Sequence, residues 1–334
     1  MCLTERSRLI PRCAAVWSRL RFYDLGPKCP FSMVTQYVNG KATPTVADGR
    51  DDHMNQDSAK TATLRSKIDV HRPAVAMAAH NPLAAKLAAG AGFDAIWGSG
   101  FELSASYAVP DANILSMDIH LEMMRAIGEV QDAPVVADID TGFGNAVNVA
   151  YVIPRYEAAG VAAVVMEDKT FPKDSSLRAG GRQELVPIAE FQGKLAAAKA
   201  AGAVLVIART EALIAGLGQK EALRRGGAYA EAGADGVLIH SKQKTPDEIL
   251  AFCRAWPGRV PLVLVPTSYP QLSFADVTAL GKSASSSAAT TLFAPPSQRC
   301  KAHSVASWLK AELRAWRAIS PLSRRSLRYR ETSI

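Results

Sequence analysis

Short apolar runs recur along the middle of the chain, and each of them ends in polar or charged residues. Runs of about five residues bounded in this way predict strands buried on both faces, which is typical of a parallel sheet. Seven such strands are expected, at residues 74–78, 93–97, 134–138, 162–166, 204–208, 236–240 and 261–265.

The segments between the runs have the apolar spacing of amphipathic helices. Helices are expected at 83–91, 117–130, 187–201, 220–232 and 246–256, and one more is expected to run through Tyr156. Gly160 and Gly233 follow predicted helices, as glycine commonly does at a helix C-terminus. Strict alternation of strands and helices demands a parallel sheet, and seven units with an eighth expected indicate an α/β fold, a (β/α)8 TIM-type barrel.

The eighth unit is not recognisable. After Gly281, residues 282–291 read Lys-Ser-Ala-Ser-Ser-Ser-Ala-Ala-Thr-Thr and contain no apolar run. Our hypothesis is a frameshift near residue 282, in the gene or in its sequencing, so that the eighth unit is lost or misread; resequencing tests this. The alternative is a disordered Ser/Ala/Arg tail, which leaves the barrel unclosed and its edge strands exposed.

The basic charge lies at the two ends of the chain. Of the formal net charge of +8, residues 282–334 contribute ten Lys or Arg and two acids, and residues 1–53 contribute eight and five. The middle keeps 21 basic and 24 acidic residues, so nucleic acid is not expected as a partner. No run of eighteen apolar residues suggests a membrane span, and a hydrophobic content of 48% is ample for a core.

Three regions follow from these patterns. Residues 1–53 are expected to be a non-core extension, either disordered or the result of a start codon assigned too early, with Met54 as the true start; a mitochondrial transit peptide is the alternative. Residues 54–281 form the barrel and the catalytic domain, and 282–334 form an aberrant, disordered basic tail. Cys253 is the one cysteine of the middle region, which indicates a reducing compartment, and we expect the cytoplasm.

Carboxylates follow two neighbouring strands of the predicted barrel. Asp138 and Asp140 share one face because side chains alternate along a strand, and Glu167 ends the next strand. A cluster of acids is costly unless a cation neutralises it. Oxygen ligands without His or Cys suit Mg²⁺, with Mn²⁺ or Co²⁺ as alternatives. The competing interpretation is that these acids cap helices and turns.

Cationic and backbone groups complete the candidate site. Arg209 and His240 end later strands and suit an anionic substrate, although a structural ion pair of Arg209 with Glu167 or Glu211 is the alternative. The segment Trp97-Gly98-Ser99-Gly100 could offer backbone N–H groups to a carboxylate, whereas a tryptophan alone is more often core.

The loop of residues 168–182 is interpreted as a lid. It carries Lys169, Lys173, Arg178 and Arg182, with glycines as possible hinges. Such a loop suits the closure of cationic groups over a phosphorus-bearing substrate with exclusion of water. A solvated loop is the alternative.

Several motifs together resemble the isocitrate lyase/phosphoenolpyruvate mutase superfamily. The resemblance covers residues from about 74 to 280, in the right order. The motifs that carry it are Trp97-Gly98-Ser99-Gly100, Val109-Pro110-Asp111, Ala137-Asp138-Ile139-Asp140-Thr141-Gly142-Phe143-Gly144, Glu167-Asp168-Lys169, Ile207-Ala208-Arg209 and Leu238-Ile239-His240-Ser241.

The lid selects a branch within that superfamily. Its lyases carry a cysteine in the loop, and this chain has Lys173-Asp174-Ser175-Ser176 there, so lyase activity is not expected. The mutase has asparagine at the position of Ser175, and the hydrolase has a hydroxyl residue. The resemblance therefore implies hydrolysis of the C–P bond of 3-phosphonopyruvate to pyruvate and phosphate. The alternatives are the mutase reaction and an inactive product of a frameshifted gene.

The resemblance also implies roles for individual residues. Asp138 would hold Mg²⁺ directly, with Asp111, Asp140 and Glu167 acting largely through its waters. The metal and the Ser99 and Gly100 amides would bind the pyruvoyl oxygens, next to Trp97 and Phe101. The phosphoryl group would be surrounded by Lys173, Ser175, Arg209 and His240. Members form tetramers that swap the eighth helix, for which this chain has no recognisable residues; a homo-oligomer is expected on resemblance alone.

Overall fold

The computed structural model describes residues 34–38, 41–45, 50–68, 73–176, 178, 180–257, 260–266, 268–269, 271–283 and 290–294. By internal contacts the chain divides into two units, Met1–Asp51 and Asp52–Ile334. The first contains an antiparallel hairpin of β1 (Val34–Val38) and β2 (Lys41–Thr45). The sequence analysis did not predict this hairpin. Two residues, Asn39 and Gly40, separate its strands, and this pair is the strongest short hairpin signal in a sequence.

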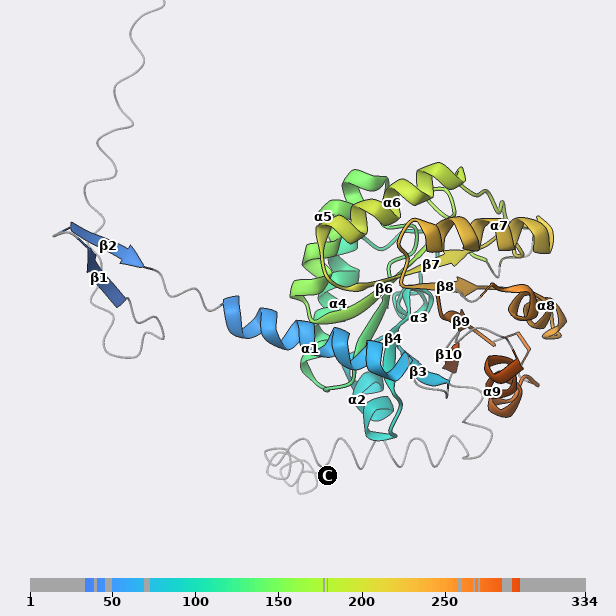
Figure 1. Ribbon diagram of the computed structural model, residues 1–334, viewed down its shortest axis with the longest axis horizontal. Coiled ribbons are helices and arrows are strands. Elements are labelled where there is room, and N and C mark those ends of the chain that lie inside the picture. Colours follow the sequence, from blue (N-terminus) through green and yellow to red (C-terminus); the bar gives the residue numbers. More distant parts are fainter. Residues whose placement is uncertain are drawn as a thin grey trace, which may run out of the picture. The chain divides into compact units, whose positions relative to one another are not determined.

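Eight parallel strands of the second unit close into a barrel (Figure 1), which confirms the predicted α/β architecture. The seven predicted strands are all present, with ends that differ by at most two residues. Around the barrel, in chain order, the strands are β3 (Ala74–Ala79), β4 (Ala95–Gly98), β5 (Val135–Asp138), β6 (Val161–Glu167), β7 (Leu205–Thr210), β8 (Gly236–Ile239), β9 (Leu262–Leu264) and β10 (Thr290–Ala294).

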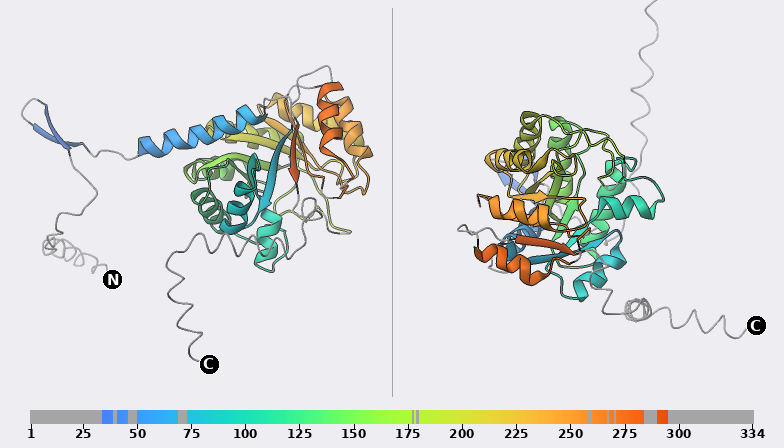
Figure 2. Two further views of the ribbon diagram at one scale, coloured as in Figure 1. Left: turned by 90° about the horizontal axis from the view of Figure 1, so that it is seen from below. Right: turned by 90° about the vertical axis from the view of Figure 1, so that its right-hand side faces the viewer.

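The eighth strand corrects the expectation of an unclosed barrel. Strand β10 pairs in parallel with β9 on one side and with β3 on the other. In both views of Figure 2 the orange-red β10 lies beside the blue β3. Its sequence, Thr-Thr-Leu-Phe-Ala, is short but rich in β-branched and aromatic residues, which favour strands. The rest of the predicted tail, and with it any eighth helix after β10, lies outside the described residues.

Helices follow the strands as predicted. They are α2 (Pro82–Gly90), α4 (Met117–Glu129), α5 (Ala146–Ala158), α6 (Ile188–Ala201), α7 (Gly218–Glu231) and α8 (Asp247–Ala255). Three further helices are not predicted: α1 (Arg50–Ile68), α3 (Gly100–Ser106) and α9 (Phe274–Ser283). None of the described helices has both the length and the apolar content that a membrane crossing requires.

The alternation of side chains along the strands divides the core in two. Inward-facing residues such as Val136, Val165 and Ile207 form one cluster, whereas their neighbours along the strands pack against the helices. Leu64 and Ile68 of α1 belong to the inner cluster, so this helix fills the end of the barrel where the strands begin. The same alternation points polar side chains into the interior at the other end of the barrel, where the strands stop.

Two aspartates join α1 to the start of the barrel. The carboxylate of Asp94 accepts a hydrogen bond from the Val75 amide at 3.0 Å, and that of Asp235 accepts one from the Val206 amide at 2.8 Å. Helix α1 reaches both sites: Lys67 Nζ donates to the carbonyl of Asp94 at 2.8 Å, and Arg65 Nη2 lies 3.2 Å from Asp235 Oδ1. Asp94 thus connects β3 to the start of β4, and Asp235 connects β7 to the start of β8.

Leu64→Ala should lower the free energy of unfolding by about 3 kcal/mol, because it removes a buried side chain from the inner cluster and leaves a cavity. Urea unfolding followed by circular dichroism measures the change. Leu217→Ala is the control: Leu217 is 50% exposed, and its loss should change stability by less than about 0.5 kcal/mol. Equal losses in the two variants would contradict the assignment of α1 to the barrel core.

Candidate active site

Four carboxylates meet at the end of the barrel where the strands stop. Asp138 ends β5, Glu167 ends β6, Asp140 follows β5, and Asp111 lies in the loop before α4. Three of them lie around Lys173 of the lid, whose Nζ lies 2.9 Å from Asp111 Oδ1 and 3.9 Å from Glu167 Oε1 and also pairs with Asp140. Asp138 Oδ2 lies 3.8 Å from Arg209 Nη1 instead. The structure therefore brings the predicted acids together; we call these four carboxylates the acid cluster.

The backbone after β5 is held in an uncommon conformation. Asp140 has φ of 53°, in the left-handed region that non-glycine residues rarely adopt. Its carbonyl accepts a hydrogen bond from the Glu167 amide at 2.7 Å, and the buried Lys194 donates to the next carbonyl, that of Thr141, at 2.8 Å. The backbone of Gly100 lies close to the Asp140 side chain, because a Cβ at Gly100 would be only 3.3 Å from Asp140 Oδ1. These contacts aim the Asp140 carboxylate at Lys173.

The acid cluster has the donor set of a divalent cation site. Both carboxylate oxygens of Glu167 are buried without a hydrogen-bond partner. Burial raises the pKa of Asp138 to about 7, with Arg209 lowering it and Asp140 raising it. The Lys173 ammonium lies among these acids as a compensating cation, and within the described residues no three Asp, Glu, His or Cys side chains are arranged to hold a metal ion. Buried oxygen donors without His or Cys fit Mg²⁺.

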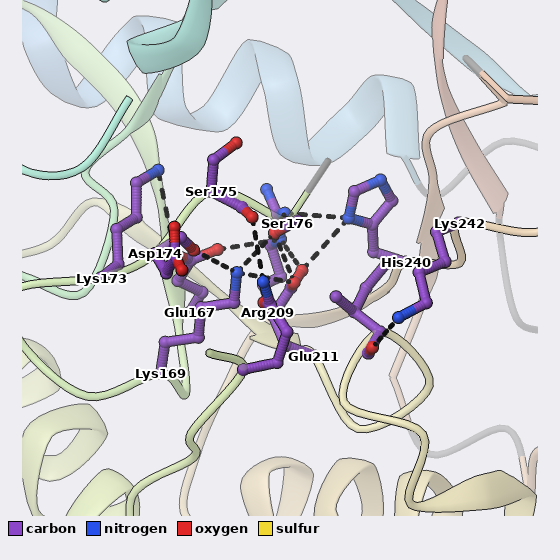
Figure 3. Close-up of polar contacts among 12 residues, drawn as sticks. Glu167, Lys169, Lys173, Asp174, Ser175, Ser176, Arg209, Glu211, His240 and Lys242 are labelled. Carbon is purple, nitrogen blue, oxygen red and sulfur yellow. Dashed lines mark hydrogen bonds and ion pairs between the residues drawn. The ribbon is translucent and has the colours of Figure 1, made fainter. Parts of the chain in front are cut away.

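A cationic group faces these acids from the other side of the mouth. Arg209 Nε lies 2.5 Å from Glu211 Oε1 and 3.3 Å from Glu167 Oε2, so both ion pairs considered from the sequence are present. Its Nη2 lies 2.9 Å from Nδ1 of His240 (Figure 3). Burial lowers the pKa of His240, and the charge of Arg209 lowers it further. The same Nδ1 also lies 3.2 Å from Glu211 Oε1, so it faces both a donor and an acceptor.

Glu211 and Ser176 are functional candidates that the sequence analysis did not select. Ser176 Oγ donates to Glu211 Oε2 at 2.5 Å, and it lies 3.2 Å from Arg209 Nη2 (Figure 3). Burial raises the pKa of Glu211, but Arg209 and His240 outweigh it and hold that pKa well below its usual range. Glu211 lies two residues after Arg209 on the same face, a signal that could have identified it. Ser176 had no such signal.

Buried groups behind Glu211 hold it in place. Its backbone amide donates to Asp168 Oδ1 at 2.9 Å. Asp168 in turn accepts hydrogen bonds from Tyr229 OH at 2.6 Å and from Arg225 Nη1 at 3.0 Å. Arg225 and Tyr229 thereby connect the buried face of α7 to the end of β7, where Arg209 lies.

The lid divides into an inner and an outer part. Lys169 and Ser176 are buried, and Lys169 Nζ donates to Ser176 Oγ at 2.7 Å and to the Asp174 carbonyl at 2.8 Å. The side chains of Arg178 and Arg182 are exposed instead, with Arg178 paired to Asp174. Of the four cationic residues expected over the substrate, the structure places Lys169 and Lys173 inside and the two arginines outside.

The remaining predicted residues are placed less centrally. Within the described residues the hydroxyl of Ser175 has no hydrogen bond, while its carbonyl accepts one from Gln183 at 3.0 Å. Ser99 caps α3 through the Glu102 amide at 3.1 Å, Trp97 is buried inside the barrel, and Phe101 is half-exposed. Asn113, which was not selected, donates to Asp140 Oδ2 at 3.0 Å and accepts from the Lys173 amide at 2.7 Å.

Comparison with known proteins shows which family the chain belongs to. The sequence family described as phosphoenolpyruvate phosphomutase matches residues 64–298, well over half of the chain. The chain belongs to the phosphoenolpyruvate phosphomutase family. The superfamily resemblance noted from the motifs is thereby confirmed.

Several members of the phosphoenolpyruvate phosphomutase family and its superfamily can be compared directly. A phosphonopyruvate hydrolase of Variovorax sp. (strain Pal2) is 72% identical over 226 residues, covering 67% of this chain and 78% of the relative. A phosphoenolpyruvate phosphomutase of Tetrahymena pyriformis is 43% identical over 213 residues, covering 63% and 71%. The crystal structure of a phosphonopyruvate hydrolase complex with oxalate and Mg²⁺ aligns with 77% of this chain and 87% of its own, at 62% identity and a TM-score of 0.66.

Glu211→Gln should destabilise the protein by about 3 kcal/mol, because it leaves the buried Arg209 and Lys169 short of one negative charge. Urea unfolding measures the loss. Glu122→Gln is the matched control, since Glu122 pairs with Arg125 on the surface, and its effect should be much smaller. A similar loss in both variants would contradict the role given to Glu211.

Proposed function

We propose that this chain hydrolyses the C–P bond of 3-phosphonopyruvate to pyruvate and phosphate in a Mg²⁺-dependent reaction. The observation that carries the proposal is the 72% identity to the Variovorax phosphonopyruvate hydrolase, together with a barrel mouth in which acids and cations face each other. The mutase reaction remains the alternative, supported by relatives of lower identity, such as the one at 43%.

The acid cluster is proposed to hold the metal through Asp138, Asp140 and Glu167, with Asp111 beside them. Bound there, Mg²⁺ would supply the positive charge that stabilises the enolate of pyruvate when the phosphorus departs. The Gly100 amide is proposed to bind the pyruvoyl oxygens, with Trp97 and Phe101 nearby. Support for this placement is the close approach of Gly100 to Asp140 Oδ1. The Ser99 amide, expected from the sequence to share this role, already donates to the Ala79 carbonyl at 3.2 Å.

The cationic side of the mouth is proposed to bind the phosphoryl group. Arg209 is held in place by Glu211 and Glu167, so its guanidinium needs little reordering to bind phosphoryl oxygens. His240, which lies beside Arg209, is proposed to contribute a hydrogen bond to the same group. Lys173 and Ser175 of the lid are proposed to bind the phosphoryl group as well. A serine contribution from this part of the lid is supported by the neighbouring Ser176, whose hydroxyl is buried.

The assembly and location of the chain are also proposals. A small-molecule phosphonate is the substrate, and we propose a homo-oligomer, a tetramer on resemblance alone, in the cytoplasm. We propose residues 54–281, together with β10, as the catalytic domain, since every residue placed in the site falls within 54–281 and β10 closes the barrel around it. Closure of the barrel by β10 favours an active enzyme over the inactive product of a frameshifted gene.

Phosphorus NMR of phosphonopyruvate with the purified chain and Mg²⁺ should show inorganic phosphate, and EDTA should abolish its release until excess Mg²⁺ is added. The control is the same chain restored in frame from codon 282. A phosphoenolpyruvate signal would move the assignment to the mutase. Turnover by the restored chain alone would mean that the chain as written is inactive.

Ser175→Asn should slow phosphate release by about tenfold, because it replaces the hydroxyl with the amide found at this position in the mutase. Ser175→Thr keeps the hydroxyl and is the matched control, with a rate expected within about threefold of the unmodified chain. Initial rates of phosphate release at saturating substrate measure both. An unchanged rate for the asparagine variant would show that position 175 does not govern the outcome.

A further inference from the structure

We propose that Asn113 is a positioning residue that latches the lid, residues 168–182, onto the acid cluster. No sequence motif singles it out beyond its place two residues after Asp111. Its kinetic consequence rests on the proposed function, whereas its effect on the lid does not.

The side-chain amide of Asn113 bridges two parts of the site that are distant in the sequence. Its Nδ2 donates to Oδ2 of Asp140 at 3.0 Å, and its Oδ1 accepts from the backbone amide of Lys173 at 2.7 Å. One end of an amide can only donate and the other only accept, so the two contacts fix its orientation. Asn113 thereby holds the lid backbone and an acid of the cluster at a set separation.

The backbone conformation at Asn113 also suits its bridging position between the lid and the acid cluster. Its φ is 56°, in the left-handed region, which asparagine and glycine tolerate better than most residues. The conformation turns the loop between α3 and α4 at this residue. A residue type that accepts the turn and carries both a donor and an acceptor is asparagine, and aspartate lacks the donor.

A second anchor lies on the other side of the lid. Lys169 holds the Asp174 carbonyl and Ser176 Oγ, and lies 3.3 Å from Glu211 Oε2. Residues 173–176 are thus held by Asn113 at one end and by Lys169 at the other. Loss of the Asn113 contact leaves the end that carries Lys173 held only by the ion pairs of its ammonium with Asp111, Asp140 and Glu167, and so weakens its hold on the acid cluster.

The outer part of the lid offers a reporter that does not depend on catalysis. The side chains of Arg178 and Arg182 are 68% and 74% exposed, so trypsin can reach them once the loop leaves its anchors. Cleavage requires local opening, and the rate of cutting at these two sites therefore measures how often the lid opens.

The experiment compares Asn113→Gly with Asn113→Asp in the full chain. Glycine keeps the left-handed backbone and removes both hydrogen bonds; aspartate keeps the acceptor for Lys173 and replaces the donor to Asp140 with a like charge. Gln192→Ala is the control, because it removes one side-chain amide that bonds to the Ala228 carbonyl away from the site. Brief trypsin digestion read by mass spectrometry, without substrate, gives the cleavage rates.

Both Asn113 variants should be cut at Arg178 and Arg182 about tenfold faster than the unmodified chain, while cleavage at Arg224 on α7 stays the same. Phosphate release should show kcat lowered by about tenfold with a smaller change in KM, because the lid closes over bound substrate less often. The control should match the unmodified chain in both assays.

Unchanged cleavage in the glycine variant would overturn the latch. Wild-type behaviour of the aspartate variant would overturn the contact to Asp140, leaving Lys173 as the sole partner. An unmodified chain that releases no phosphate would refute the proposed function instead, and the trypsin result would still decide the role of Asn113.

Discussion

The mouth of the barrel depends on the neutralisation of buried carboxylates. Asp138, Asp140, Glu167 and Glu211 are all buried, and removing an unpaired charge from water costs several kcal/mol or more. Arg209 balances Asp138, Glu167 and Glu211 from within the barrel, whereas the lid brings Lys173 to Asp140. The position of the lid therefore depends on the charge of the site. Binding of a metal and an anionic substrate would change the charge of the site and the position of the lid together.

Much of the fold and the charged part of the site could be predicted because they follow from local periodicity. Apolar runs identify seven strands, and a side-chain period of two places Asp138, Glu167 and Arg209 on the inner face. These residues end their strands, and all parallel strands of a barrel end on the same side. The meeting of residues about 70 positions apart is thus a consequence of topology.

The rest depends on contacts that no local pattern encodes. Strand β10 has only five residues and a polar beginning, and its place comes from the open edges of β9 and β3 on either side. Ser176 was passed over for its neighbour Ser175 because the path of a loop decides which of two serines faces inward. Asn113 has no distinguishing neighbours in the sequence, and its two partners lie 27 and 60 residues away.

The paired aspartates at the start of the barrel stand at opposite points of its circumference. Asp94 and Asp235 each follow an Ala-Gly pair that ends a helix, with φ of 81° at Gly92 and 94° at Gly233. Each also binds the amide of the preceding strand, and the strands they introduce, β4 and β8, stand four places apart among eight. The end of the barrel where the strands begin is therefore clasped at two opposite points, each of which holds one strand against the next.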